Sequence, residues 1–290
     1  MKIFDPEGIL SEKISEKDKK EFHSKFIENK SVFGVDIYRY SDYPENIQVY
    51  VPVLFNTIYY LTALGCIKNE GFFFNNYAID YEGFKEKFIS TGDGGFQIFD
   101  NPIQSIIFGA YFELNVRRFN SGSFVSIQNK NLHDIIGRID LRYCITFDKV
   151  YNYDANFYGA GIINNARILA KDNLNRLLID NWTLKWIEQQ ANTIENLVVA
   201  KKADFLKMPA FKTFDKKSDS KIFNDSDEST GAKSIDVQKI GSIRSKNTQL
   251  DIYNLKIQFL FNFNGTKPVF EREFKSFLYT IGNLNTQGIQ

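Results

Sequence analysis

Apolar residues recur at two spacings along this chain, and these spacings separate its predicted strands from its predicted helices. Alternating or continuous apolar runs predict strands at 31–37, 72–79, 84–90, 95–99, 139–147, 235–242 and 249–261. Three-to-four-residue spacing predicts helices at 9–29, 47–64, 101–118 and 162–171, and a short helix at 269–278. Residues 174–179 and 182–190 are a further strand or helix pair. Because strands and helices interleave with several hairpins, the sequence predicts an α+β fold with a mixed, mainly antiparallel sheet.

Two aspartates stand where predicted strands end. Asp36 closes the apolar run 31–37, and Asp93 lies in a glycine-rich turn between the strands 84–90 and 95–99. Glycines flank Asp93, so a bulky anion or a metal ion can approach the main chain closely. Two strand-end carboxylates in one sheet predict an oxygen-ligand site for Mg²⁺ or Mn²⁺. The alternative is that both aspartates cap turns, where this residue type is common.

Composition and charge narrow the class of protein. The chain has 290 residues, with 43% hydrophobic and 16% aromatic residues, enough for a packed core. A net charge of +1 gives no strong field toward nucleic acid or an anionic membrane, and two histidines exclude a multi-histidine zinc site. The cysteines, Cys66 and Cys144, lack CxxC spacing. With no stretch of membrane-spanning length recognised, we expect a soluble protein of the reducing cytoplasm.

Four segments in one order resemble the motifs of the class III nucleotidyl cyclase catalytic domain. Residues 35–41 (Val-Asp-Ile-Tyr-Arg-Tyr-Ser) resemble that family's first metal-binding segment, and 91–93 (Thr-Gly-Asp) resemble its second. Residues 158–169 resemble the turn and helix that carry transition-state residues, and 240–246 resemble the terminal hairpin with a phosphate-binding lysine. The likeness spans roughly residues 31–261.

The resemblance implies a fold, a site and an assembly. The fold is a ferredoxin-type mixed sheet flanked by helices, in a head-to-tail homodimer. Asp36 and Asp93, with the carbonyl of Ile37, are implied to hold two divalent cations, Mn²⁺ or Mg²⁺. Arg167 is implied to stabilise the transition state and Lys246 to hold the terminal phosphates, both supplied by the partner chain. The implied reaction is attack of a nucleoside triphosphate's 3′-hydroxyl on its own α-phosphorus, which releases pyrophosphate.

The chain departs from the family pattern at several substrate-binding positions. Ile163 stands where the family has its ribose-binding asparagine, and Asn164, one residue later, is the candidate replacement. Ile89 and Asn156 occupy the two base-reading positions and match neither the adenylate nor the guanylate pair. Tyr38, in the first metal segment, is a further candidate for substrate binding.

The combination of apolar Ile89 with the Asn156 amide, together with residues 90–99 (Ser-Thr-Gly-Asp-Gly-Gly-Phe-Gln-Ile-Phe), resembles the pyrimidine cyclases of the bacterial Pycsar antiphage system. This resemblance implies that UTP is converted to cyclic UMP, with CTP as the alternative because one amide satisfies either base by flipping. The product would act on a separate cyclic-nucleotide-gated effector. The alternatives are a purine cyclase and an inactive cyclase-homology module that binds a nucleotide without turnover. A diguanylate-cyclase reading lacks the acidic pair after Gly94-Gly95.

The same resemblance divides the chain. Residues 1–30 are expected to form an N-terminal helical extension, 31–262 the cyclase domain, and 263–290 a C-terminal tail. Residues 214–234 are rich in Ser, Asp and Lys and are expected to be a flexible insertion in that domain.

Overall fold

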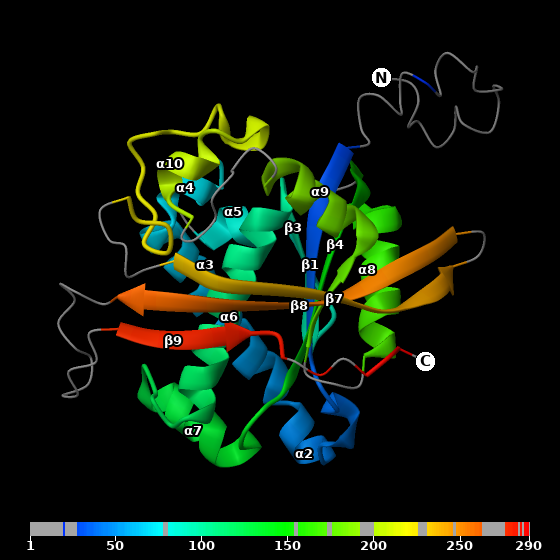
Figure 1. Ribbon diagram of the computed structural model, residues 1–290. Coiled ribbons are helices and arrows are strands. Elements are labelled where there is room, and N and C mark those ends of the chain that lie inside the picture. The colour runs from blue at the N-terminus through cyan, green and yellow to red at the C-terminus, as the bar shows by residue number, and fades with distance from the viewer. Residues whose placement is uncertain are drawn as a thin grey trace, which may run out of the picture.

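A computed structural model gives the fold of the chain (Figure 1). The structure describes residues 20, 28–77, 81–153, 156–172, 176–191, 200–225, 231–245, 248–262, 276–283, 285 and 287–289. Most of the helix predicted at 9–29 therefore lies outside the described residues, as do Lys246 and residues 263–275. Glu28 and Asn29, which the prediction placed at the end of that helix, begin a strand instead.

The first half of the fold alternates as β-α-β-β-α-β, the ferredoxin-type order. Its four strands lie in the order β2-β3-β1-β4, and every neighbouring pair is antiparallel. These elements are β1 (Glu28–Ile37), α3 (Val51–Asn69), β2 (Phe88–Ser90), β3 (Gly94–Phe99), α6 (Pro102–Asn120) and β4 (Leu141–Tyr153). β1 lies between β3 and β4 and is buried over most of its length.

The second half extends the same sheet beyond β4. β6 pairs with β4 in parallel, β8 pairs antiparallel with β6, and β7 and β9 both pair antiparallel with β8. The added elements are α8 (Ala160–Lys171), β6 (Leu177–Asp180), α9 (Asn181–Ala191), β7 (Gly231–Ser245), β8 (Thr248–Asn262) and β9 (Ser276–Ile281). The fold is thus α+β, with a mixed, mainly antiparallel sheet flanked by helices, and this prediction is confirmed.

Helices cover both faces of the sheet. α3 and α6 lie on one face and α8 on the other side of β1 and β4 (Figure 1). The larger core fills the α3–α6 face and is aromatic, with Phe33 of β1 packed against Phe108 and Phe112 of α6. Smaller clusters under α8 contain Cys144, Ile168 and other residues. Both cysteines are buried free thiols.

Short elements connect these units. They are the 3₁₀ helices η2 (Tyr40–Asp42) and η3 (Pro209–Phe211), the helices α2 (Glu45–Gln48), α4 (Gly71–Phe74), α5 (Tyr81–Lys85), α7 (Ile127–Ile136) and α10 (Lys202–Phe205), and the strand β5 (Asn156–Tyr158). α7 was not predicted from the sequence.

The start of α6 is the one that its sequence signals predict. Asn101 accepts the backbone N–H of Gln104, the Gln104 side chain accepts the Asn101 N–H, and Pro102 occupies the first turn. This reciprocal capping box satisfies two of the N–H groups that a helix start leaves unpaired.

The expectation that no stretch has membrane-spanning length was wrong. Glu45–Asn69 is long and apolar enough to cross a membrane, by length and composition only, a test that the buried core helix of a soluble protein also passes. In this fold α3 packs against α6, and its buried residues, such as Phe55 and Tyr59, belong to the aromatic core. The apolar character therefore has an internal explanation.

Two predicted strands were wrong in part. Residues 71–74 form α4 and 81–85 form α5, so within 72–79 and 84–90 only Phe88–Ser90 is a strand among the described residues. A run of three phenylalanines does not reveal its period, and here Phe72, Phe73 and Phe74 are all buried in a helical turn. The helix predicted at 269–278 was also wrong where it is described, because Ser276–Leu278 belong to β9.

The expected flexible insertion at 214–234 is partly a core element. Ser220, Ile222 and Phe223 are buried, and residues 231–234 begin β7. Glu70, fully buried at the end of α3, accepts hydrogen bonds from the Ser220 hydroxyl and from the N–H groups of Lys221 (3.2 Å) and Ile222 (3.0 Å). Composition predicted a flexible insertion, but the buried carboxylate at the end of α3 anchors its residues 220–222.

Candidate functional site

The two aspartates predicted to bind metal, Asp36 and Asp93, are backbone neighbours at one end of β1. Asp36 pairs in register with Gly94 of β3, and Asp93 precedes Gly94 by one residue. The N–H of Ile37 donates to the carbonyl oxygen of Asp93 (3.0 Å). A turn closed by the Thr91 N–H and the Gly94 carbonyl (3.0 Å) holds Asp93 at this position. Asp36, Asp93 and Ile37 are therefore brought together.

Gly94 is what lets the two strands meet so closely at the site. A Cβ at this position would lie 2.2 Å from the Val35 carbonyl oxygen and 2.7 Å from the Cα of Asp36. Both contacts are with backbone, which cannot move aside without separating β1 from β3. The glycine-rich turn thus serves close approach of the two carboxylate-bearing strands.

Arg142 completes the cluster, and the sequence did not identify it. It faces Asp36 from β4, donating through Nε to Oδ1 (2.8 Å) and through Nη2 to Oδ2 (2.5 Å). Each of these two side chains is 19% exposed, so the ion pair is shielded but reachable. The ring of Tyr38 lies against the guanidinium, 5.6 Å from Cζ to the ring centroid. The alternation of 139–147 placed Arg142 on a strand, but no local signal names a partner 106 residues away.

The charges at the site influence one another. Burial raises the pKa of the Asp93 carboxyl and the negative charge of Asp36 raises it further, while a backbone hydrogen bond and the charge of Arg142 oppose the shift. Burial lowers the pKa of Arg142, but its hydrogen bonds and ion pair with Asp36 raise it more. A partly buried carboxylate beside a second one is stabilised by any cation that reaches it.

The donor set fits a hard divalent cation. Asp36 and Asp93 offer carboxylate oxygens, the ligand type that Mg²⁺ and Mn²⁺ prefer. Among the residues that the structure describes, no group of three or more His, Cys, Asp or Glu side chains is placed to hold a metal. A cation here would therefore complete its coordination with water and substrate oxygens, as Mg²⁺ commonly does in nucleotide sites.

The remaining predicted residues do not join this cluster. Ile89 lies on β2, two strands from β1, and pairs with Phe96 of β3. Asn156 is exposed on β5, and its side chain accepts the N–H of Phe157 (2.8 Å). Asn164 is 8% exposed and donates to Asp148 of β4 (3.3 Å), so it is turned toward the sheet.

Arg167 lies on the outer side of α8. Asn164, Asn165, Ile168 and Leu169 are the buried face of this helix against the sheet, so the spacing of 3.6 residues per turn puts Ile163 and Arg167 on the opposite side. Ile163, at the family's asparagine position, is 50% exposed.

The predicted residues thus divide into two groups separated along β4. This strand has Arg142 opposite Asp36, whereas its Tyr153 lies opposite Asn156. The eleven residue steps between Arg142 and Tyr153 would span roughly 35 Å in a straight strand at 3.3 Å per residue. One copy of the chain therefore does not bring Asn156 to the Asp36–Asp93 pair.

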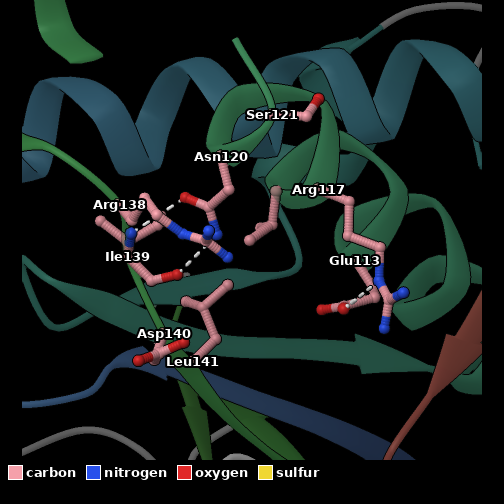
Figure 2. A pocket seen from close by; sticks show the side chains of 9 residues that line it. Glu113, Arg117, Asn120, Ser121, Arg138, Ile139, Asp140 and Leu141 are labelled. Carbon is pink, nitrogen blue, oxygen red and sulfur yellow. Dashed lines mark hydrogen bonds and ion pairs between the residues drawn. The ribbon is translucent and has the colours of Figure 1, made fainter. Parts of the chain in front are cut away.

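A surface pocket of about 370 Å³ opens beside this end of the sheet, and neither Asp36 nor Asp93 lines it (Figure 2). Its walls come from the end of α6 and the start of β4: Glu113, Val116, Arg117, Asn120, Ser121, Arg138, Ile139, Asp140 and Leu141. Arg117 is already bound to Glu113 (2.6 Å) and to the carbonyl oxygen of Thr280 (2.6 Å). The Asn120 side chain donates to the carbonyl oxygen of Ile139 and accepts the N–H of the same residue. Because Arg117 and Asn120 are already hydrogen-bonded within the protein, we do not place the substrate in this pocket.

Comparison with known proteins finds similar solved structures. No protein-family model and no curated protein matches the chain. The adenylate/guanylate cyclase/hydrolase from Silicibacter pomeroyi is similar over 79% of this chain and 96% of its own, at 10% identity and a TM-score of 0.41. The adenylyl cyclase CyaB from P. aeruginosa is similar over 79% of this chain and 95% of its own, at 11% identity and a TM-score of 0.39. The guanylate cyclase domain of RhGC from Catenaria anguillulae, solved with GTP, covers 79% and 96%, at 11% and 0.41. Similarity at these values is distant.

Proposed function

We propose that this protein is a metal-dependent nucleotidyl cyclase that acts on a pyrimidine nucleoside triphosphate, with UTP favoured over CTP. The observation that carries the proposal is the convergence of Asp36, Asp93 and Arg142 at the end of β1. Two carboxylates and one guanidinium suit a substrate that is itself a polyanion accompanied by cations.

The residues of this chain have separate tasks in the proposed reaction. Asp36 and Asp93 would hold one or two divalent cations, Mn²⁺ or Mg²⁺, which when bound acidify the 3′-hydroxyl and neutralise the triphosphate. Arg142 balances the charge of Asp36 before the substrate arrives. In the proposed reaction it would exchange that carboxylate for phosphate oxygens. Attack of the 3′-oxygen on the α-phosphorus forms the new P–O bond, the bond to pyrophosphate breaks, and the hydroxyl proton passes to solvent.

A second copy of the chain is part of this proposal. Asn156 lies far along β4 from Asp36, and Arg167 faces outward from α8. In a head-to-tail homodimer these residues, with Lys246 of the terminal hairpin, would face the aspartates of the other copy. Arg167 would then stabilise charge on the phosphoryl oxygens and Lys246 would hold the terminal phosphates.

The base assignment rests on Ile89 and Asn156. An apolar Ile89 side chain offers no hydrogen bond to a purine edge, whereas the Asn156 amide can read uracil or cytosine.

We infer that the cyclic nucleotide made in the cytoplasm is a signal in antiphage defence that acts on a separate effector. Cells that lose protection against phage when Asp36 is replaced by Asn would support this role, and unchanged protection would reject it.

Product analysis tests the activity directly. The purified protein is incubated with each of the four nucleoside triphosphates and Mn²⁺, and products are identified by mass spectrometry. We expect cyclic UMP or cyclic CMP from the parent and none from Asp93→Asn. Cyclic AMP or cyclic GMP alone would overturn the base assignment, and no product from any of the four would overturn the activity.

Mixing inactive variants tests the shared site. A heterodimer of Asp36→Asn with Arg167→Ala has one site with both residues intact, so random mixing should restore about a quarter of the parent activity. The matched control mixes Asp36→Asn with Asp93→Asn. Both of these residues come from the same copy, so every site in that mixture lacks one carboxylate and activity should stay absent. Equal recovery in the two mixtures would contradict the head-to-tail arrangement.

One observation favours a second candidate, an inactive nucleotide-binding module. Ile163 cannot hydrogen-bond a ribose, and Asn164 is turned inward to Asp148. Calorimetry that shows binding of a nucleoside triphosphate by protein that forms no product with Mn²⁺ or Mg²⁺ would favour this reading. Turnover by the parent would exclude it.

A further inference from the structure

The third donor of Arg142 begins a chain of buried contacts that leads away from the site. While Nε and Nη2 hold Asp36, Nη1 donates to the carbonyl oxygen of Asp172 (3.1 Å), just after α8. The Asp172 carboxylate in turn accepts Arg176 through Nε (3.1 Å) and Nη2 (2.9 Å). Asp172 and Arg176 are 0% and 2% exposed. We propose that Asp172 and Arg176 are positioning residues for Arg142, and that the C-terminal segment after Gly282 locks them in place.

The contacts continue from Arg176 to the C-terminal segment, whose described residues are Asn283, Asn285 and 287–289. Nη1 of Arg176 donates to the carbonyl oxygens of Asn285 (3.1 Å) and Gln287 (2.7 Å). The side chain of Asn254, 4% exposed on β8, donates to the carbonyl oxygens of Asn283 (2.8 Å) and Asn285 (3.3 Å). Two buried side chains thus hold the main chain of this segment.

The fold also shapes the route that the segment takes. Gly282 turns the chain out of β9 at φ 78°, and a Cβ there would lie 2.2 Å from the carbonyl oxygen of Leu255. At the far end, Ile289 packs against the cluster under α8, and its N–H approaches the carbonyl oxygen of Ile240 (3.4 Å). The protein therefore contacts the segment at its start beside Gly282, at Asn285 and Gln287, and at Ile289.

Arg176 needs the segment for a physical reason. A buried guanidinium carries five N–H donors, and the Asp172 carboxylate accepts from Nε and Nη2. The carbonyl oxygens of Asn285 and Gln287 serve Nη1, and without them this charged donor must move to find water or another acceptor. The Asp172 carboxylate is bound to Arg176, so Asp172 moves with it. The Asp172 carbonyl oxygen then shifts, and Arg142 loses the contact that fixes its orientation.

The expected consequence rests on the proposed cyclase function. An arginine that must meet a triphosphate in one orientation binds it more weakly when a neighbour no longer orients it. We expect removal of residues 283–290 to raise the KM for the nucleoside triphosphate about tenfold or more, as for the loss of one hydrogen bond to a charged group. The kcat should change less than threefold, because the metal ligands and Arg167 remain.

The kinetic experiment compares three proteins: the full chain, a chain ending at Gly282, and Ser220→Ala. We call the contacts from Arg142 through Asp172 and Arg176 to the C-terminal segment the relay. Ser220 is the matched control because its hydroxyl binds Glu70 and anchors a different buried segment, outside the relay. A synthetic peptide of residues 283–290 is then added to the shortened chain. We expect the raised KM in the shortened chain alone, and its recovery toward the parent value with the peptide. An unchanged KM, or an equal rise in Ser220→Ala, would overturn the proposal.

A second measurement does not depend on turnover. The Nε–H signal of Arg142 in a ¹⁵N-labelled protein is assigned by its loss in Arg142→Lys. We expect this signal to shift or broaden in the shortened chain and to stay in place in Ser220→Ala. If no nucleotide is converted, the proposed function fails while this spectrum still tests the relay. An unmoved Arg142 signal in the shortened chain would reject the relay even if the enzyme is active.

Discussion

Replacing Gly94 with alanine tests whether close approach of β1 and β3 makes the site. The new Cβ would lie 2.2 Å from the Val35 carbonyl oxygen, 2.7 Å from the Cα of Asp36 and 2.9 Å from its Cβ. Ordinary van der Waals contact begins near 3.4 Å, so the strands must separate locally by about 1 Å. Since Asp93 precedes Gly94, that movement separates the two carboxylates.

Two magnitudes follow from this displacement. Overpacking a well-packed position typically lowers the free energy of unfolding by about 1–3 kcal/mol, and we expect Gly94→Ala to fall in this range. Displacement of a catalytic group by about 1 Å can reduce activity by about 100-fold, and we expect a loss of that order in kcat/KM. The affinity for Mn²⁺ should fall as well, because two ligands no longer reach one ion.

The assay pairs urea unfolding with Mn²⁺ calorimetry and cyclase kinetics. Gly122→Ala is the control: Gly122 has φ 76°, so alanine there is strained by about 1–2 kcal/mol, yet its Cβ meets nothing closer than 3.9 Å. The control should lose stability while keeping Mn²⁺ affinity and activity. If Gly94→Ala binds Mn²⁺ as tightly as the control, the reasoning from strand separation is wrong.

Three further predictions concern other parts of the fold. Burial raises the pKa of Glu70 to about 7, although its hydrogen bonds oppose the shift. The stabilisation from the protonated Glu70 is therefore full below about pH 4.5 and is lost as the pH rises through 7. In urea unfolding, the free energy of unfolding should fall by about 3 kcal/mol over this range in the parent and not in Glu70→Gln. Asn101→Ala should lower the free energy of unfolding by about 1 kcal/mol without altering Mn²⁺ binding, and a loss near zero would contradict the capping box. Arg142→Lys keeps the charge but not the two-pronged contact, so KM for the nucleotide should rise about tenfold or more, and an unchanged KM would exclude Arg142 from phosphate binding.

Local signals predicted the elements that carry the site. The helix start at Asn101-Pro102 and the hairpin around Gly92-Asp93 were predicted correctly, because caps and glycine turns act over a few neighbouring residues. The run Phe72–Phe74 was misread as a strand because a continuous apolar run is compatible with either period. Polar composition predicted a flexible insertion at 214–234 and missed the anchoring of residues 220–222, because Glu70 is 150 residues from Ser220.

The roles assigned to Asp36, Asp93, Asn156, Arg167 and Lys246 are predictions that the proposed experiments address. What the sequence determined by itself is where each carboxylate stands: at a strand end and in a turn, since alternation and glycine spacing are local properties. Only the tertiary structure decided that Arg142 faces Asp36, and that Asn156 lies far from both along β4. Strand register joins residues more than a hundred positions apart through packing of the whole sheet, so no short stretch of sequence encodes it.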